Sequence, residues 1–263
     1  MQNAPRVGTR MSERRVAFVT GASAGIGAAT ARALGALGWS VGIGARRAER
    51  LEAVAADIDA AGGHAFAHVL DVSDPASLQK FFDAAEQALG PVDVLVNNAG
   101  VCHPGLLHEV APQDLEDELK TNLLGPLLLS RLAVKSLLAR SAPGDVVFVS
   151  SENAVRPRTF QVGYTATKTG MEAVAAVLRM ELERTGIRAT VVRPGPTGTE
   201  FGHDWEPEVI QRLVESWKYW GLYRYMDSLP PESVAHAVKT VVTAPAGTHF
   251  DCIEVMPQPP AET

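Results

Sequence analysis

A tyrosine and a lysine four residues apart could together move a proton. Tyr164 and Lys168 form a Tyr-x-x-x-Lys pattern, and on a helix this spacing places both side chains on one face. A phenol has a pKa of about 10 in water, which is too high for ready proton exchange at neutral pH. A nearby ammonium stabilises the phenolate and lowers that pKa, so Tyr164 could donate a proton to a carbonyl oxygen or take one from an alcohol. A chance pair on the protein surface is the alternative.

A hydroxyl group stands 13 residues before this tyrosine. Ser151 follows the apolar run 145–150, which is typical of a buried strand. The hydroxyl could hold a substrate oxygen in place while negative charge develops on it. Hydride transfer would have to come from a bound cofactor, which the protein positions and polarises.

A glycine-rich loop forms a second candidate site. Residues 20–27, TGASAGIG, follow the first apolar run directly and precede a helical pattern. Glycines let the backbone turn tightly and approach a ligand, and the next helix N-terminus offers free N–H groups to a pyrophosphate. A purely structural turn is the alternative. The loop also matches the Gly-x-Ser-x-Gly elbow of hydrolases, with Ser23 as nucleophile, but such an elbow follows several strands and only one precedes it here.

Taken together, these motifs resemble those of the short-chain dehydrogenase/reductase family. Along residues 14–200 they are, in order, the glycine loop, Asn97-Asn98-Ala99-Gly100, Asn122, Ser151, Tyr164-x-x-x-Lys168 and Pro194-Gly195. The resemblance implies a nicotinamide cofactor and a catalytic set of Asn122, Ser151, Tyr164 and Lys168. In the family, the lysine also holds the nicotinamide ribose, and the asparagine helps to anchor a chain of waters that relays protons past the lysine.

The residue after the second strand indicates which cofactor is bound. NAD-dependent enzymes of this fold place an acid there, which accepts hydrogen bonds from the ribose 2′-hydroxyl. By alignment with the family this position is Ala45, and Arg46 and Arg47 follow at once. Guanidinium groups stabilise a 2′-phosphate that a carboxylate would repel. We therefore expect NADP(H), with Arg46 as the main phosphate contact and Ser23 as a second one; a solvated arginine pair opening a helix is the alternative.

The resemblance also assigns the remaining cofactor contacts. Asp71 and Val72 would hold the adenine edge, although Asp71 could instead cap the turn before the next helix. Thr197 would contact the nicotinamide end and Thr199 a phosphate. The full expected set is Gly21, Ser23, Gly25, Ile26, Gly27, Arg46, Arg47, Asp71, Val72, Asn98, Ala99, Gly100, Tyr164, Lys168, Pro194, Gly195, Thr197 and Thr199, with Asn97 lining the same side.

Aromatic residues are concentrated in residues 200–230, where the family builds a variable substrate lid. Three of the four Trp and three of the four Tyr lie there. Aromatic side chains offer large apolar areas of fixed shape, and concave sites use them. We expect a bulky apolar or aromatic ketone or secondary alcohol, contacted by Asn153, Phe160, Phe201 and Trp205. Packing of the lid onto the core, or a subunit interface, would explain these aromatics equally well.

Two other functions stay open at this point. The chain ends in IEVMPQPPAET rather than in a Gly-rich segment, which favours the branch acting on small alcohols and hydroxy acids over 3-oxoacyl reductases. A non-catalytic NADP-binding sensor would need only the glycine loop, so the four intact catalytic positions argue against it.

The elements that must position these residues follow from alternating patterns. Short β-rich runs cover 16–20, 41–45, 65–71, 92–97, 145–150, 188–193 and 252–256, and helical patterns cover 28–37, 48–61 and 76–89. Asp74 and Pro75 are typical of an N-cap and a first helical residue. We expect an α/β fold of Rossmann type, with a doubly wound, parallel, seven-stranded sheet in a single domain, 13–263, after a flexible extension, 1–12. The resemblance adds two long helices, 112–138 and 160–185, that would build a homodimer or homotetramer.

Composition limits the classes of partner. The 263 residues carry 24 Lys and Arg against 30 Asp and Glu, a net charge of −6, which argues against a nucleic-acid or anionic-membrane binder. We expect no metal, because the seven His are scattered and two Cys offer few ligands. We identify no apolar run of the roughly 18 residues that a membrane span needs, and no signal-like apolar stretch at the start, so a cytoplasmic protein is expected.

Overall fold

A parallel sheet of seven strands forms the centre of the computed structural model, which describes residues 14–222 and 227–259. The strand order is β3-β2-β1-β4-β5-β6-β7, and every neighbouring pair is parallel. The strands are β1 (Val16–Thr20), β2 (Ser40–Ala45), β3 (His64–Val69), β4 (Val94–Asn97), β5 (Gly144–Val149), β6 (Ile187–Pro194) and β7 (Cys252–Val255). The chain builds outward from β1 and then returns to β4, so the order reverses between these two strands. The expected doubly wound Rossmann-type sheet in a single domain is confirmed.

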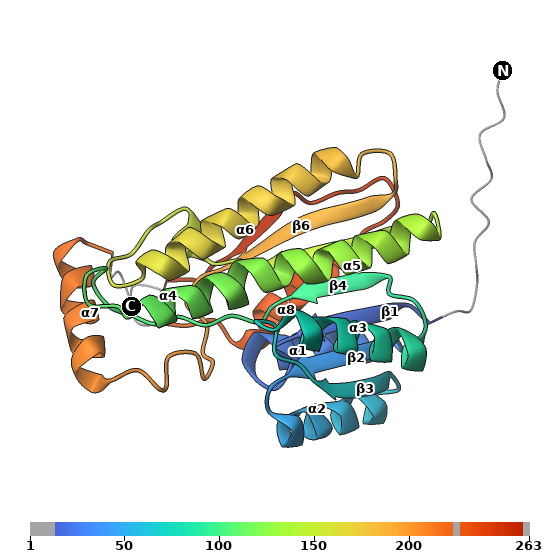
Figure 1. Cartoon of the computed structure of the whole chain (residues 1–263), viewed down its shortest axis with the longest axis horizontal. Helices are drawn as coiled ribbons and strands as arrows, with labels where there is room; N and C mark the ends of the chain where they lie inside the picture. Colours follow the sequence, from blue (N-terminus) through green and yellow to red (C-terminus); the bar gives the residue numbers. More distant parts are fainter. Residues whose placement is uncertain (1–13, 223–226, 260–263) are drawn as a thin grey trace.

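Helices cover both faces of this sheet (Figure 1). One face is covered by α1 (Gly25–Gly35), α2 (Ala48–Ala60) and α8 (Pro231–Val242), and the other by α3 (Pro75–Leu89), α5 (Gly125–Ala139) and α6 (Val162–Glu181). Two more helices, α4 (Pro112–Leu119) and α7 (Pro207–Tyr219), lie toward one end of the molecule. The expected extension 1–12 lies outside the described residues.

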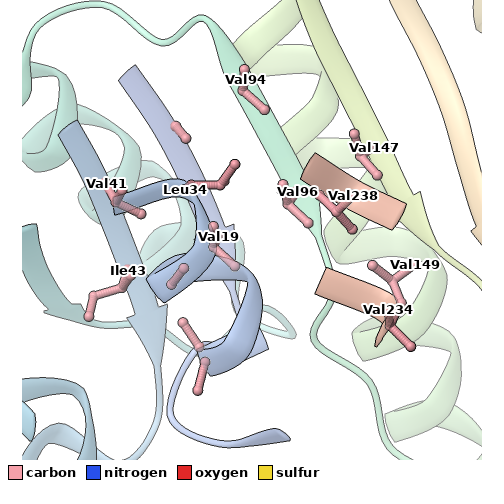
Figure 2. Close-up of a cluster of buried hydrophobic side chains, with 14 of the residues drawn as sticks. Val19, Leu34, Val41, Ile43, Val94, Val96, Val147, Val149, Val234 and Val238 are labelled. Carbon is pink, nitrogen blue, oxygen red and sulfur yellow. The ribbon is translucent and has the colours of Figure 1, made fainter. Parts of the chain in front are cut away.

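The core is divided by the sheet into two layers. Alternate residues of β1 point to opposite faces, so Ala17 and Val19 join the layer under α1 and α8, while Val16 and Phe18 join the layer under α3, α5 and α6. Figure 2 shows the first layer, with valines of five elements gathered against Leu34 of α1. Both layers are fully covered, which explains why several strands are apolar throughout.

The cap of α3 and the long helix 112–138, both expected from the sequence, are present in the structure. Asp74 caps α3 as expected, accepting a hydrogen bond from Ala76 N at 2.9 Å, and Pro75 is the first helical residue. The expected long helix 112–138 is present as one helical run, 112–139, in which the structure places a π-helical turn, Lys120–Leu124, between α4 and α5. Such a turn carries one extra residue inside a continuous helical run, and turns of this kind occur frequently at functional sites.

This run also corrects the expectation that nothing resembles a membrane span. Residues 112–139 are long enough and apolar enough to cross a membrane, with a mean hydropathy of 1.3 in the best window. A single helix of this kind is weak evidence, because core helices of globular proteins have the same composition. Within the run, Asn122 and Ser130 are buried and hydrogen-bonded to other elements of the fold.

Candidate active site

The expected catalytic residues come from three elements that meet beyond the carboxyl end of β5. Ser151 follows β5, Tyr164 and Lys168 lie in the first two turns of α6, and Asn122 lies in the π-helical turn. Ser151 lies close enough to Tyr164 for its hydroxyl to influence the pKa of the phenol. Lys168 Nζ lies 5.6 Å from the centre of the Tyr164 ring. The structure therefore brings the four residues together, and their catalytic roles stay predictions.

Asn122 is held by three hydrogen bonds. Its Nδ2 donates to Val101 O at 2.8 Å and to Thr167 Oγ1 at 3.2 Å, while its Oδ1 accepts from Val101 N at 2.8 Å. A Cβ built on Gly100 would lie 3.3 Å from Asn122 Oδ1 and 3.5 Å from Lys168 Nζ. A glycine at position 100 therefore leaves the space beside both polar groups open.

Lys168 is an ammonium group in buried surroundings. Only 3% of the residue is exposed, and Nζ donates to Val149 O at 2.9 Å. Burial lowers the pKa of Lys168 to about 8, because removing a cation from water disfavours its charged form. This hydrogen bond holds the ammonium on the last residue of β5.

The pKa of Tyr164 is shifted in the direction opposite to the one expected from the sequence. Burial raises the pKa of the phenol, the interaction with Ser151 lowers it, and the charges of Cys102 and Glu118 raise it further. The net direction is upward, so the expected depression by Lys168 is not present in the chain alone. The physical reason is that desolvation disfavours both the phenolate and the ammonium. Tyr164 is therefore a neutral phenol, which is the form that donates a proton.

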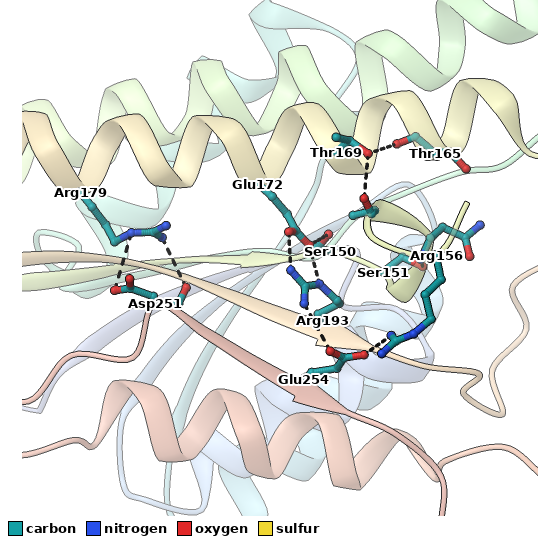
Figure 3. Close-up of polar contacts among 12 residues, drawn as sticks. Ser150, Ser151, Arg156, Thr165, Thr169, Glu172, Arg179, Arg193, Asp251 and Glu254 are labelled. Atoms are coloured by element: carbon teal, nitrogen blue, oxygen red, sulfur yellow. Dashed lines mark hydrogen bonds and ion pairs between the residues drawn. The ribbon is translucent and has the colours of Figure 1, made fainter. Parts of the chain in front are cut away.

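Ion pairs hold α6 against β6 and β7, and so fix where Tyr164 and Lys168 stand (Figure 3). Glu172 of α6 accepts from Arg193 Nε at 2.9 Å, from Arg193 Nη2 at 2.6 Å and from Ser150 Oγ at 2.8 Å. Arg193 also pairs with Glu254 of β7, which pairs in turn with Arg156. We call these five residues the α6 network. Thr169 Oγ1 donates to Ala154 O at 3.3 Å and ties the same helix to the turn after Ser151.

The glycine loop is built for close backbone approach. Gly21 has φ +66°, a left-handed conformation that favours glycine. A Cβ on Gly27 would lie 2.3 Å from Gly21 O, so no larger residue fits where α1 passes the loop. Ala24 caps α1 without a side-chain hydrogen bond, which leaves the helix N-terminus without a side-chain acceptor. Asn98 Nδ2 donates to Thr20 O at 2.9 Å, so the Asn98 side chain positions the loop from β4.

An exposed cluster of arginines lies beside this loop. Arg47 Nε and Nη2 donate to Ser23 Oγ at 3.2 and 3.0 Å, and Arg47 Nη1 lies 2.7 Å from Glu200 Oε2. Arg50 Nη1 lies 2.5 and 2.6 Å from the two Glu200 oxygens. Arg46 is exposed on the same turn. We call Ser23, Arg46, Arg47, Arg50 and Glu200 the arginine corner. Arg47 is the guanidinium that bonds Ser23, and the expected phosphate contacts of Arg46 and Ser23 stay predictions.

The remaining expected cofactor residues line the same end of the sheet. Asp71 Oδ1 accepts from Ser73 N at 2.9 Å and Ser73 Oγ at 2.6 Å, which lowers the pKa of Asp71 and shows the turn-capping alternative. Its adenine role stays a prediction.

The other expected cofactor residues have these surroundings in the structure. Val72 is buried under α3 and α5, Pro194 ends β6, and Gly195 N donates to Val255 O at 2.8 Å. Thr197 Oγ1 bonds Gly195 O, and Thr199 lies against Gly25. Ile26 packs on the core, and Ala99 N donates to Thr20 Oγ1.

One of the expected substrate residues, Phe201, contacts Tyr164. The Phe201 ring lies 5.6 Å from the Tyr164 ring and 5.9 Å from that of Trp205, measured between centres. Trp205 Nε1 donates to Cys102 O at 3.0 Å. Asn153 is buried and bonds Gln161 Oε1 at 2.6 Å, directly before α6. The substrate roles of these residues stay predictions.

The other aromatics of residues 200–230 serve different purposes. The Trp217 indole donates to Thr159 O at 3.0 Å and lies under the Arg158 guanidinium, and the Phe160 ring lies under Arg212, so these contacts fasten α7 to the loop before α6. Tyr219 and Trp220 are exposed. Tyr223 and Tyr225 lie outside the described residues. Both explanations therefore apply: some of these aromatics lie at the site, and others pack residues 200–230 onto the rest of the chain.

Three residues at the site went unnoticed in the sequence. Glu118 of α4 is buried, accepts from His103 N at 2.8 Å and has a raised pKa because it is desolvated. Gln161 bonds Asn153 before α6, and Glu200 is the carboxylate of the arginine corner. Glu118 stands four residues before Asn122, one helical turn away, and this spacing was the available signal. Within residues 14–222 and 227–259, no group of three metal-ligating side chains lies close enough to hold an ion.

Comparisons with known proteins agree with this geometry. A family model described as short chain dehydrogenase matches residues 15–209. The chain is 33% identical over 251 residues to 2,3-dihydro-2,3-dihydroxybenzoate dehydrogenase of Bacillus subtilis (strain 168), covering 92% of this chain and 95% of that one.

Solved structures give the same fold with more than one cofactor. An alcohol dehydrogenase from the archaeon Thermococcus sibiricus, complexed with 5-hydroxy-NADP, superposes with a TM-score of 0.78 at 29% identity, covering 95% of this chain and all (100%) of that one. A 3-ketoacyl-(acyl-carrier-protein) reductase from Brucella melitensis, complexed with NADH, gives a TM-score of 0.78 at 28% identity, covering 93% and 97%. Similar structures therefore hold nicotinamide dinucleotides with or without the 2′-phosphate.

Proposed function

The chain belongs to the short-chain dehydrogenase/reductase family, whose members are nicotinamide-dependent oxidoreductases, and on this premise we propose an NADP(H)-dependent enzyme. It interconverts a ketone or aldehyde and a secondary alcohol, and its substrate is bulky and apolar or aromatic. The observation that carries the proposal is that Tyr164 lies beside Ser151, with the buried Lys168 Nζ 5.6 Å from the centre of its ring.

The proton chemistry follows from these three side chains. The Ser151 hydroxyl donates a hydrogen bond to the substrate oxygen and holds it against Tyr164. In reduction, the neutral phenol gives its proton to that oxygen, which suits its raised pKa. In oxidation, the phenol first gives its proton to water, the phenolate then takes the proton of the alcohol hydroxyl, and the Lys168 ammonium stabilises that phenolate. Asn122 is fixed on Val101 and on Thr167, the residue before Lys168. The dinucleotide supplies or accepts the hydride when it is bound.

The residues present fit a phosphorylated dinucleotide. Ala45 stands where an NAD-dependent enzyme would have an acid, and Ser23, Arg46 and Arg47 gather beside the glycine loop. A carboxylate, Glu200, already lies on two of the guanidinium groups of the arginine corner, which supports an affinity of this site for oxyanions. The open N-terminus of α1 would hold the pyrophosphate.

The rings beside Tyr164 support the substrate class. The Phe201 ring lies within ring-contact distance of the phenol, and the Trp205 ring packs against Phe201 in turn, which extends the apolar surface. The named substrate of the Bacillus subtilis relative is a dihydroxylated cyclic carboxylate, which shares the ring but not the apolar character. On this basis we favour a cyclic ketone or secondary alcohol over a short hydroxy acid or an acyl-carrier substrate.

We also propose a homodimer or homotetramer built on α4, α5 and α6. Apolar side chains on these helices are exposed in the single chain, including Leu119, Leu127, Leu138, Val177 and Met180. Exposed apolar surface of this extent is typical of a subunit interface. Sedimentation equilibrium would measure the mass of the assembly, and a monomer at micromolar concentration would contradict this part.

The proposal is tested with purified enzyme and a panel of carbonyl compounds. The disappearance of reduced cofactor is followed by absorbance with NADPH and with NADH, on cyclic ketones, oxo acids and 3-oxoacyl thioesters. We expect turnover with NADPH that is highest on cyclic or aromatic ketones. The matched control is Ser151→Ala, which keeps the fold and removes the hydroxyl that holds the substrate oxygen. Binding of NADPH without turnover on any carbonyl would support a non-catalytic sensor instead.

A further inference from the structure

We propose that Glu200 competes with the 2′-phosphate of the cofactor for Arg47 and Arg50, and so links recognition of that phosphate to the segment that covers Tyr164. The inference rests on the proposed NADP(H) preference and goes beyond it. It assigns Glu200 as a residue that lowers the affinity for the phosphorylated cofactor.

The contacts engage three of the five N–H groups of Arg47. Its Nε and Nη2 donate to Ser23 Oγ, and its Nη1 donates to Glu200 Oε2 at 2.7 Å. Arg50 Nη1 contacts both oxygens of the same carboxylate. A phosphate arriving at Ser23 and Arg47 therefore competes with Glu200 for these guanidinium groups.

Charge makes the two occupants mutually exclusive. The two arginines lower the pKa of Glu200 to about 2, so the carboxylate is ionised throughout the neutral range. A phosphate monoester carries up to two negative charges near pH 7, and two anions repel each other at one guanidinium. Because exposed ion pairs contribute little free energy, the phosphate displaces Glu200 rather than being shut out.

Glu200 is also joined to the catalytic tyrosine by a short stretch of chain. We define residues 199–205 as the lid segment. Thr199 lies against Gly25 of the glycine loop, and Phe201 N donates to Thr199 Oγ1 at 3.2 Å. Phe201 then contacts Tyr164, and Trp205 bonds Cys102 O. Release of Glu200 therefore removes an anchor of the segment whose rings cover the proton donor.

Equilibrium binding separates this inference from the proposed function. Dissociation constants for NADPH and NADH are measured by cofactor fluorescence for the wild type, Glu200→Gln and Glu206→Gln. The last variant removes one exposed charge from the neighbouring position before α7, outside the arginine corner. We expect Glu200→Gln to bind NADPH about 3- to 10-fold more tightly, with NADH unchanged within about twofold. Glu206→Gln is expected to match the wild type.

The outcomes are distinct. Equal or weaker NADPH binding by Glu200→Gln overturns the inference, because it would mean that Glu200 is indifferent to the phosphate or orients the arginines for it. Equal binding of NADPH and NADH by the wild type overturns the NADP(H) preference on which the inference rests. A matching gain in Glu206→Gln would show a general charge effect and would also overturn it.

Hydrogen exchange tests the link to the lid segment without any turnover. Deuterium uptake of a peptide covering 196–206 is compared in complexes saturated with NADPH or with NADH. We expect faster uptake at the Phe201 and Trp205 amides with NADPH, because Glu200 is then released. The difference is expected to vanish in Glu200→Gln. Identical uptake with both cofactors in the wild type contradicts the link.

Discussion

Two clusters of arginine and carboxylate use the same pairing in different surroundings. In the α6 network, the side chains of Arg193 and Glu172 are 15% and 18% exposed, and a serine hydroxyl completes the carboxylate's bonds. In the arginine corner, Arg50 and Glu200 are 48% and 46% exposed. Water competes for the second pair and hardly for the first, so burial decides which pair is a permanent clamp.

This difference matches the demands on each region. Proton transfer needs Ser151 and Tyr164 held at one geometry, and the α6 network fixes the helix and the strand that carry them. On the proposed function, a cofactor enters and leaves at every turnover, and the exposed arginine corner exchanges partners with it. The molecule thus has a fixed ion-pair network under α6 and an exchangeable one beside the glycine loop.

The largest effect is expected in the fixed region. Tyr164→Phe removes the proton donor and is expected to lower kcat by about 10²–10⁴-fold, because general acid catalysis contributes on that scale. The dissociation constant for NADPH should stay within about twofold, since the arginine corner is untouched. Steady-state rates and cofactor fluorescence measure the two quantities. Activity of wild-type size in this variant would rule out Tyr164 as the donor.

A pair of variants compares the two clusters directly. Glu172→Gln leaves Arg193 partly buried with one weakened partner and is expected to lower the free energy of unfolding by about 2–3 kcal/mol. Glu200→Gln, the matched exposed substitution, is expected to change it by less than about 1 kcal/mol. Urea unfolding followed by tryptophan fluorescence gives both values. Equal losses in the two variants would show that burial does not distinguish the clusters.

The pH dependence of stability also separates the regions. Burial lowers the pKa of Lys168 to about 8 in the folded chain, whereas an unfolded lysine titrates at about 10.4. Between these values the unfolded chain binds more protons, so stability from this group increases as the pH rises from 8 to 10. The cofactor-free wild type is expected to gain about 2 kcal/mol over this range relative to Lys168→Met, measured by urea unfolding.

The exposed region supplies the contrast in the same experiment. Glu200, with a pKa of about 2, stays ionised from pH 8 to 10 and contributes no change. The cysteine and tyrosine groups near Lys168, whose pKa values burial raises, are common to both proteins and cancel in the comparison. A wild type and a Lys168→Met variant with parallel pH profiles would contradict the buried ammonium.

An effect of comparable size is expected at the edge of the arginine corner. Arg46→Asp places a carboxylate beside the expected 2′-phosphate and is expected to lower the NADP/NAD ratio of kcat/KM by about ten- to hundredfold. The ratio is measured with one substrate and both oxidised cofactors. An unchanged ratio would remove Arg46 from cofactor selection and leave that role to Arg47, which is the arginine bonded to Ser23.

The sequence predicted the strands well, because each is an apolar run between turns. The boundaries of β1 and the cap of α3 agree with prediction, since one depends on the glycine loop and the other on Asp74-Pro75. Helix α8 was not assigned, although Pro231 with Val234, Val238 and Val241 has the right spacing. Its apolar face packs on strands far away in the sequence, which a local pattern does not reveal.

The site was less predictable where it depends on long-range contacts. The Tyr-Lys spacing predicted that both would share a face of α6, as they do. The direction of the Tyr164 pKa was not predictable, because it follows from burial by the whole fold. Glu200 lies 150 residues from Arg50, and only the folded chain brings the two together. The NADP(H) preference stays a prediction.

The π-helical turn around Asn122 makes this stretch of the chain intolerant of a change in length. Each residue of a regular helix advances the side chains by about 100°, so deleting one residue from Lys120–Leu124 would swing everything before it around the axis relative to α5. A variant with this turn shortened would have a more regular helix, but the Asn122 amide would no longer stand where it does relative to Lys168. Insertions and deletions should therefore leave these five residues intact.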